Sequence, residues 1–385
     1  MDQVRLGVIG IGGMARSHMK SFGDVPGVKF VAAADPSESA RAHAAEYGVK
    51  VFEDGNELIG SGLVDAVLIA TPHYFHPPYA IAAFKQGLHV LTEKPIGVTA
   101  KAAQEMIDEA DRHPELVFGA MFQMRVNPLW REVKRIIDSG AIGRLHRVSW
   151  TITIWFRTQA YYDSGGWRAT WSGEGGGVLI NQCPHNLDLF QWLVGLPKRV
   201  TAQVGLGKYH DIEVEDEVNA LLEFENGATG TFITSTAEAP GVNRLEIVGE
   251  DATLIAEAGE IKLLRNHAGA LAYSKTTTER FAKPPHDVQT IKPGGRDAGH
   301  LGITRNFINA ILHGEKLIAP ARDGIRGLEL GNAMLMSGIR HKPVDLPTDR
   351  EAFDALIQEL IANSTFEKKE VAATAGDDLA SSFVK

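Results

Sequence analysis

Apolar and polar positions along the first third of the chain predict strands that alternate with helices. The segments between the apolar runs, at 76–87 and 99–114, have helical periodicity and end in helix-stop residues. Strand–helix alternation predicts an α/β fold with a doubly wound parallel (Rossmann) sheet, whose site lies at the carboxyl ends of its strands. The predicted strands lie at residues 4–9, 28–34 and 64–70, within 87–95, and within 116–124.

The periodicity changes after about residue 124. A helix is predicted over 127–140, and then a series of period-two runs predicts an α+β domain with an open-faced, mostly antiparallel sheet, in which Asn226-Gly227 marks a hairpin. We expect domains at 1–123 and 124–345, followed at 346–385 by a helix and a poorly ordered tail. The period-two runs cover 198–207, 216–227, 228–238, 243–257 and 261–266, and later helices are predicted near 301–313, 323–341 and 350–362.

A glycine pattern follows the first predicted strand. Gly10, Gly12 and Ala15 fit G-x-G-x-x-G/A, in which small residues let the backbone approach a pyrophosphate at a helix N-terminus. Asp35 ends the second strand, where a carboxylate can accept hydrogen bonds from the ribose hydroxyls and would repel a 2′-phosphate. The pattern predicts NAD rather than NADP, with a helix cap or turn role for Asp35 as the alternative.

Four residues with polar side chains lie at predicted strand ends. They are Asp35, Thr71, Lys94 and Gln123. Because parallel strands end at one edge of the sheet, these residues are expected to line a common site.

The segment 173–192 contains four glycines within five residues and then a predicted helix. Asn181, His185 and Asp188 have the spacing i, i+4, i+7, which predicts one polar stripe along that helix. A histidine is suited to accept the proton of an alcohol near neutral pH, although a lone helix histidine is more often structural. Asp188 is as well suited to orienting the helix as to chemistry.

An aromatic segment with two arginines precedes the glycines, at residues 155–171. Aromatic faces suit pyranose rings, and Arg157 and Arg168 suit hydroxyls or an anionic substituent. Packing in the core or at an interface is the alternative for each of these residues.

Charge and cysteine content limit the classes of partner and the cellular compartment that we expect. The formal charge is −9 over 385 residues, which disfavours nucleic acid and anionic membrane surfaces, and no apolar run is long enough to cross a bilayer. The single cysteine, Cys183, excludes an internal disulfide, so a cytoplasmic protein is expected.

These motifs together resemble the glucose–fructose oxidoreductase/inositol dehydrogenase/MocA (Gfo/Idh/MocA) family of NAD(P)-dependent sugar and polyol oxidoreductases. The resemblance spans roughly residues 1–345. It implies a Rossmann domain plus an open-faced sheet, whose free face would form a homodimer or homotetramer, with the last helices returning to the first domain. The resemblance rests on the motifs GVIGIGGMA, AAADPS, VLIATPHYFHPPYA, HVLTEKPIGVT and GEGGGVLINQCPHNLDLFQWLVG.

The resemblance also implies site roles. His185 would be the acid/base and Lys94 would contact the reacting hydroxyl, with Tyr162, Arg168 and Asn181 as further substrate-binding residues. Many family members have an aspartate where this chain has Asn181, and an amide cannot carry a proton. The implied cofactor-binding residues are Gly10, Gly12, Gly13, Met14, Asp35, Thr71, Pro72, His73, His76, Glu93, Lys94, Gln123, Trp167 and Arg168.

No metal site is predicted, because His73 and His76 have no carboxylate or cysteine partners in the sequence pattern. The leading function is an NAD-dependent dehydrogenase that oxidises a secondary hydroxyl of a sugar, sugar derivative or cyclitol. One alternative is a glycosidase that uses NAD transiently through oxidation, elimination, hydration and re-reduction. Another is a sensor that binds NAD without turnover.

Overall fold

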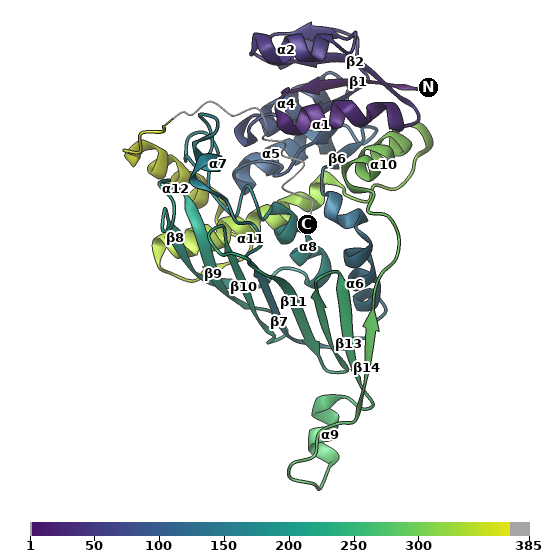
Figure 1. The fold of residues 1–385 in the computed structure, drawn as a ribbon, viewed down its shortest axis with the longest axis vertical. Helices are drawn as coiled ribbons and strands as arrows, with labels where there is room; N and C mark the ends of the chain where they lie inside the picture. Colours follow the sequence, from purple (N-terminus) through teal and green to yellow (C-terminus); the bar gives the residue numbers. More distant parts are fainter. Residues whose placement is uncertain (1, 370–385) are drawn as a thin grey trace.

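The apolar runs of the first third pair side by side in parallel, as predicted (Figure 1). The computed structural model describes residues 2–369, and its first sheet has the strand order β3-β2-β1-β4-β5-β6. The chain reverses direction of winding between β1 and β4, and this switch point opens a crevice at the carboxyl ends. The strands are β1 (Val4–Ile9), β2 (Val28–Ala34), β3 (Lys50–Phe52), β4 (Ala66–Ile69), β5 (His89–Thr92) and β6 (Phe118–Ala120).

Helices cover this parallel sheet, and three of them begin at side-chain caps. The side chains of Ser37, Asp54 and Thr99 each accept a hydrogen bond from a main-chain N–H in the first turn. The helical elements are α1 (Gly13–Ser21), η1 (Phe22–Asp24), α2 (Glu38–Ala45), α3 (Gly55–Gly60), η2 (His73–Phe75), α4 (His76–Lys85), α5 (Ala100–Asp111) and η3 (Gln123–Val126).

The second sheet has nine strands in the order β14-β13-β12-β11-β7-β10-β9-β8-β15, and all pairs except β7–β10 are antiparallel. The predicted open sheet and the Asn226-Gly227 hairpin, which joins β9 to β10, are confirmed. The central strand β7 was not predicted, although buried and half-buried residues alternate along its second half. The strands are β7 (Leu145–Ile152), β8 (Arg199–Leu206), β9 (Glu215–Glu223), β10 (Thr229–Ser235), β11 (Asn243–Gly249), β12 (Ala252–Glu257), β13 (Glu260–Asn266), β14 (His286–Ile291) and β15 (Val344–Asp345).

Later helices connect the two sheets. Phe307 and Ile308 of α10 lie in the core of the first sheet, while α11 packs against both α5 of the first unit and β8 of the second. The return of these helices to the first unit is therefore observed, and the expected domain boundaries stay predictions. The helices are α6 (Pro128–Asp138), α7 (Gln159–Asp163), α8 (Pro184–Val194), α9 (Ala270–Thr276), α10 (Gly299–His313), α11 (Ala321–Arg340) and α12 (Arg350–Asn363).

One face of the second sheet is covered by helices, and the other carries exposed side chains in alternation, such as Leu221 at 62% exposure. The predicted oligomer interface on this face stays a prediction. Within residues 2–369, no helix is both long and apolar enough to cross a membrane. The predicted tail falls largely at 370–385, outside the described residues.

The helix that carries His185 begins later than the sequence predicts. Cys183 is its N-cap and Pro184 its first residue, a position where proline's missing N–H is not needed. Asn181 therefore lies in the turn before α8, and the predicted stripe of three polar residues along one helix is wrong. His185 and Asp188 remain on α8.

The glycines before α8 let the chain pass close to other parts of the protein. A Cβ atom on Gly177 would clash with the main-chain carbonyl of Glu215, and one on Gly175 (φ +84°) would clash with Val98. The Glu215 carboxylate accepts hydrogen bonds from the N–H groups of Gly177 (2.9 Å) and Leu179 (3.0 Å). This packing fixes the position of the segment that leads into α8.

A buried ion pair anchors α8 from the other side. Arg125 donates two hydrogen bonds to Asp188, at 2.6 and 2.8 Å, and both side chains are 1% exposed. Arg125 also pairs with Asp323 at 2.8 Å, and that carboxylate is 41% exposed. Asp188 thus has a structural role in α8, which is one of the two roles left open by the sequence.

Replacing Gly177 by alanine is expected to lower the free energy of unfolding by about 2 kcal/mol or more, because the added methyl group must displace the main chain. Chemical denaturation measures the change. Gly60→Ala is the matched control, since a Cβ there meets nothing within 4 Å at the end of α3. Equal stability of the two variants would contradict the packing role.

Asp188→Asn is expected to cost about 3 kcal/mol of stability, because it leaves the buried Arg125 cation with half of its compensation. Asp323→Asn removes the more exposed partner of the same arginine and should cost under about 1 kcal/mol. Chemical denaturation of both variants tests whether Asp188→Asn loses more stability than Asp323→Asn. A larger loss for Asp323→Asn would show that Asp188 does not anchor the helix.

Candidate active site

A cleft of about 1220 Å³, including its open mouth, lies at the carboxyl ends of the first sheet and faces the segment before α8. It collects residues from distant parts of the chain: Gly10, Gly12, Gly13, Met14, Asp35, Ala70, Thr71, Pro72, His73, His76, Glu93, Lys94, Trp155, Arg157, Tyr161, Trp167, Arg168, Asn181, Gln182, His185 and His300. All predicted site residues except Gln123 and Tyr162 are among them. Ala70, Gln182 and His300 were not assigned to the site from the sequence, whereas Trp155, Arg157 and Tyr161 belong to the aromatic segment for which packing was the alternative.

The glycine loop has the shape that a dinucleotide needs. Gly10 has φ +86°, and a Cβ there would lie 2.8 Å from the Ala70 carbonyl oxygen. Gly12 is the N-cap of α1 without a side-chain cap, and the space beside it is open. The first-turn N–H groups and the positive end of α1 are thus available to a pyrophosphate, so these residues fit the cofactor.

Asp35 holds the loop at the other side. Its two carboxylate oxygens accept hydrogen bonds from the N–H groups of Ile11 (2.7 Å) and Ser37 (2.8 Å). Ser37, rather than Asp35, caps α2. Asp35 lies at the cleft, where the sequence predicted a ribose-binding carboxylate.

Lys94 follows β5 and reaches across to the second unit. Its ammonium group donates a hydrogen bond to the Asn181 carbonyl oxygen at 3.0 Å. Burial lowers the pKa of Lys94, and the Glu93 and Glu174 carboxylates oppose this shift. Glu93 and Glu174 therefore help to keep a partly desolvated cation charged.

His185 is 4% exposed and lies in the first turn of α8. Its Nε2 is 3.0 Å from the Gln123 amide nitrogen, while its Nδ1 has no partner among the described residues. Burial, then the Lys94 charge, lowers the pKa of His185 well below 6.5. The imidazole is accordingly neutral and able to accept a proton. Gln123 contacts this histidine instead of lining the cleft.

Asn181 organises the cleft through several groups. Its side-chain amide nitrogen donates to Glu174, and its amide oxygen accepts from the Tyr161 hydroxyl at 3.4 Å. Glu174 is buried within the glycine segment, and burial raises the pKa of its carboxyl group. The sequence pattern gives no indication of a role for Glu174, because a single acidic residue among glycines has no periodicity.

Tyr161 takes the place that was predicted for Tyr162. Tyr162 is 2% exposed, and its hydroxyl donates to Thr236 at 2.8 Å in the second core. The hydroxyl of Tyr161 accepts hydrogen bonds from Arg168 (3.0 Å) and Gln182 (3.2 Å). Adjacent residues on the short helix α7 point in different directions, and only the tertiary packing shows which one reaches the cleft.

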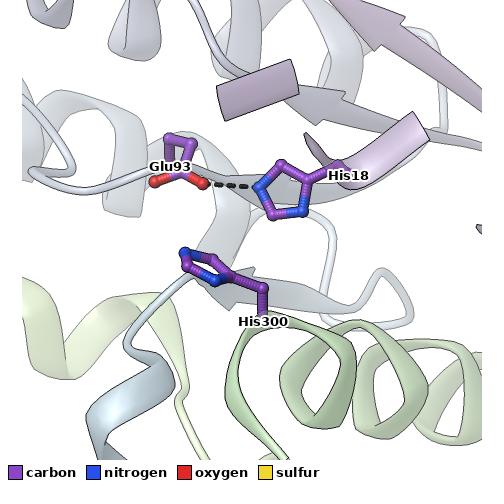
Figure 2. A group of neighbouring side chains, drawn as sticks. All are labelled: His18, Glu93 and His300. Carbon is purple, nitrogen blue, oxygen red and sulfur yellow. Dashed lines mark hydrogen bonds and ion pairs between the residues drawn. The ribbon is translucent and has the colours of Figure 1, made fainter. Parts of the chain in front are cut away.

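His18 of α1, Glu93 after β5 and His300 of α10 come together (Figure 2). Their potential ligand atoms lie within 4.8 Å of one another, a donor set that zinc accepts. However, His18 Nε2 and Glu93 Oε1 are 2.7 Å apart, whereas two ligands of a tetrahedral zinc lie about 3.3 Å apart. Burial raises the pKa of Glu93, but the His18 hydrogen bond and the charges of His18, His300 and Lys94 together outweigh burial and bring the pKa to about 2.

The cluster is therefore best described as a hydrogen-bonded pair with a neighbouring histidine that lines the cleft. The expected absence of a metal stays a prediction. His73 and His76 contact protein groups instead of forming a cluster with acids. His73 Nδ1 is 3.2 Å from the Glu174 carbonyl oxygen, and His76 bridges the carbonyl oxygens of Thr71 (2.8 Å) and Pro95 (2.7 Å).

Comparison with known proteins agrees with this geometry. Residues 4–120 match the model of an oxidoreductase family with an NAD-binding Rossmann fold, and residues 130–255 match the GFO/IDH/MocA C-terminal domain. The chain is 26% identical to the levoglucosan dehydrogenase of Pseudarthrobacter phenanthrenivorans, over 90% of this chain and 99% of that protein. It is 28% identical to the scyllo-inositol 2-dehydrogenase (NAD(+)) of Bacillus subtilis, over 90% of this chain and 98% of that protein.

A solved structure shows the same architecture. The WlbA dehydrogenase from Bordetella pertussis, in complex with NADH and UDP-GlcNAcA, superposes with a TM-score of 0.75 and 27% identity, over 91% of this chain and 99% of that one. The predictions of the fold and of NAD as the cofactor are confirmed. With a Rossmann domain, the matching C-terminal domain and relatives of nearly full length, the chain belongs to the GFO/IDH/MocA family of NAD-binding oxidoreductases.

Proposed function

We propose that the protein is an NAD-dependent dehydrogenase that oxidises a secondary hydroxyl of a sugar, sugar derivative or cyclitol. The observation that carries the proposal is that Lys94 and His185, 91 residues apart in sequence, line the same cleft as the dinucleotide loop. The two groups are close enough for the Lys94 charge to lower the pKa of His185. Such a pair can hold one oxygen between a cation and a base.

Lys94 and His185 have different tasks in the proposed reaction. Lys94 has three N–H donors, of which Asn181 takes one, so others remain for the substrate oxygen and stabilise developing alkoxide. The neutral imidazole of His185 accepts the hydroxyl proton at its unprotonated ring nitrogen, and the Gln123 side chain, 3.0 Å from Nε2, holds the ring in place. NAD, bound along the glycine loop, supplies the hydride acceptor.

The walls of the cleft support a cyclic polyol as substrate. Trp155, Tyr161 and Trp167 provide flat apolar faces, and Gln182 and the arginines provide hydrogen-bond donors. The relatives named above, a levoglucosan and a scyllo-inositol dehydrogenase, act on molecules of this class by name. They give the glycosidase alternative no support, and no feature of the cleft favours it. Assembly through the free face of the second sheet stays part of the proposal.

Lys94→Ala and His185→Asn are each expected to reduce NADH formation from a polyol panel by about 10²-fold or more, since one removes the alkoxide partner and the other the base. Absorbance of NADH measures the rate. His267→Asn, at a histidine whose side chain is 54% exposed, is the control and should be unaffected. Unchanged rates in both site variants would refute the proposed dehydrogenase mechanism and favour a non-catalytic NAD sensor.

The pH dependence of kcat/KM for oxidation should show an acid limb below pH 6.5, because His185 must be neutral and burial lowers its pKa. The rate should rise as pH increases through that pKa. At alkaline pH the rate should fall again as Lys94 loses its proton. Because the pKa of Lys94 is lowered, this fall should begin before pH 10.5. Lys94→Arg should shift any alkaline limb upward, because a guanidinium stays protonated. An acid limb above pH 6.5 would show that His185 is not the base.

A further inference from the structure

Two arginines in the cleft are held against aromatic rings. The guanidinium carbons of Arg157 and Arg168 lie 5.0 and 4.8 Å from the ring centre of Tyr161. Arg157 is also 5.8 Å from the Trp155 ring, and Arg168 is 4.7 Å from the Trp167 ring. Aromatic contacts of this kind fix the plane of a guanidinium and leave its N–H edge free for a ligand.

Neither arginine has a carboxylate partner within ion-pair distance in residues 2–369. Arg157 donates one hydrogen bond to its neighbour's carbonyl oxygen at 3.0 Å, and its buried Nε has no partner. Arg168 donates to the neutral Tyr161 hydroxyl at 3.0 Å. By contrast, the buried Arg125 has two carboxylates. Within the described part of the chain, neither guanidinium group therefore forms an ion pair, although the positive charge of Arg168 is close enough to the buried Glu174 carboxylate to oppose the rise of its pKa.

The carboxylates that line the cleft are engaged elsewhere. Asp35 accepts from the N–H groups of the glycine loop, and Glu93 pairs with His18. The cations on the substrate side are Lys94, Arg157 and Arg168, and the positive charge of both arginines contributes to lowering the pKa of Lys94. A protein of net charge −9 repels anions at long range, so this local excess of positive charge marks a recognition site.

The arginines belong to the same network as the reacting groups. Arg168 contacts the Tyr161 hydroxyl, that hydroxyl contacts the Asn181 side chain, and the Asn181 carbonyl oxygen accepts from Lys94. A ring whose hydroxyl lies between Lys94 and His185 would thus present another substituent to the arginines. A planar guanidinium with free N–H edges suits an oxyanion better than a hydroxyl, because each bond is charge-assisted.

We propose that Arg157 and Arg168 bind an oxyanion substituent, a carboxylate or a phosphate, so that the substrate is an acidic sugar or cyclitol. This inference rests on the proposed dehydrogenase function and specifies its substrate class.

The test is calorimetric titration of the full chain, loaded with NADH, with glucose, glucuronate and the primary phosphate ester of glucose. A second set uses myo-inositol, its phosphate monoester and quinate, a cyclitol carboxylate. In at least one set an anion should bind about tenfold more tightly than its neutral parent, and high salt should reduce the difference. The anion that binds more tightly than its neutral parent shows whether the arginines recognise a carboxylate or a phosphate. Anions that bind no better than the neutral parents in either set overturn the inference.

The variant Arg157→Gln/Arg168→Gln should lose the preference for the anion. Arg147→Gln, which removes an arginine paired with Glu246 on the second sheet, should keep it. A preference that survives in the double variant overturns the inference, and so does an equal loss of NADH affinity, because the arginines would then bind the cofactor. NADH formation from neutral members alone would support the dehydrogenase and refute the acidic substrate. Preferred anion binding without hydride transfer would support the oxyanion site and refute the proposed dehydrogenase function.

Discussion

The hydrogen bond from the Lys94 ammonium group to the Asn181 carbonyl oxygen joins the two units of the protein at the cleft. Lys94 lies at the end of a strand in the first sheet, and Asn181 lies in the turn that leads into α8. A partly desolvated cation is costly unless it is compensated, and here Glu93 and Glu174 provide negative charge from the two sides. The same charge that must be stabilised in the protein is the one that can stabilise an alkoxide.

The glycine segment makes this contact possible. Its close packing on the Glu215 main chain and on Val98 leaves no room for side chains, and it brings Glu174, Asn181 and His185 to the first sheet. These glycines are therefore needed for contact between protein segments. The glycines at the cofactor loop differ, because the space beside Gly12 is open.

Charge in the cleft is distributed unevenly along its length. At the cofactor end, Asp35 and the positive end of α1 match a ribose and a pyrophosphate. On the side of Lys94, the guanidinium groups of Arg157 and Arg168 lie over the Tyr161 ring, and neither forms an ion pair with any residue from 2 to 369. Because the whole protein is acidic, this positive region is a local feature, and it distinguishes the cleft from the rest of the surface.

The sequence by itself determined the parallel sheet, the glycine loop and the presence of Asp35, Lys94 and His185 at one cleft. These depend on local patterns: apolar runs, glycine spacing and strand ends, which have the same meaning wherever they occur. It also determined the antiparallel runs after residue 198, but it missed β7 and its parallel pairing with β10, because pairing partners are set by long-range packing.

Only the tertiary structure decided the remaining site residues. Tyr161 and Tyr162 are neighbours with the same chemistry, and the fold turns one to the cleft and buries the other. The helix at His185 begins at Pro184, so Asn181 acts from a turn, and Asp188 is drawn into an ion pair with an arginine 63 residues away. Contacts between residues so distant in sequence follow from how the two sheets pack, and no periodicity along the chain encodes them.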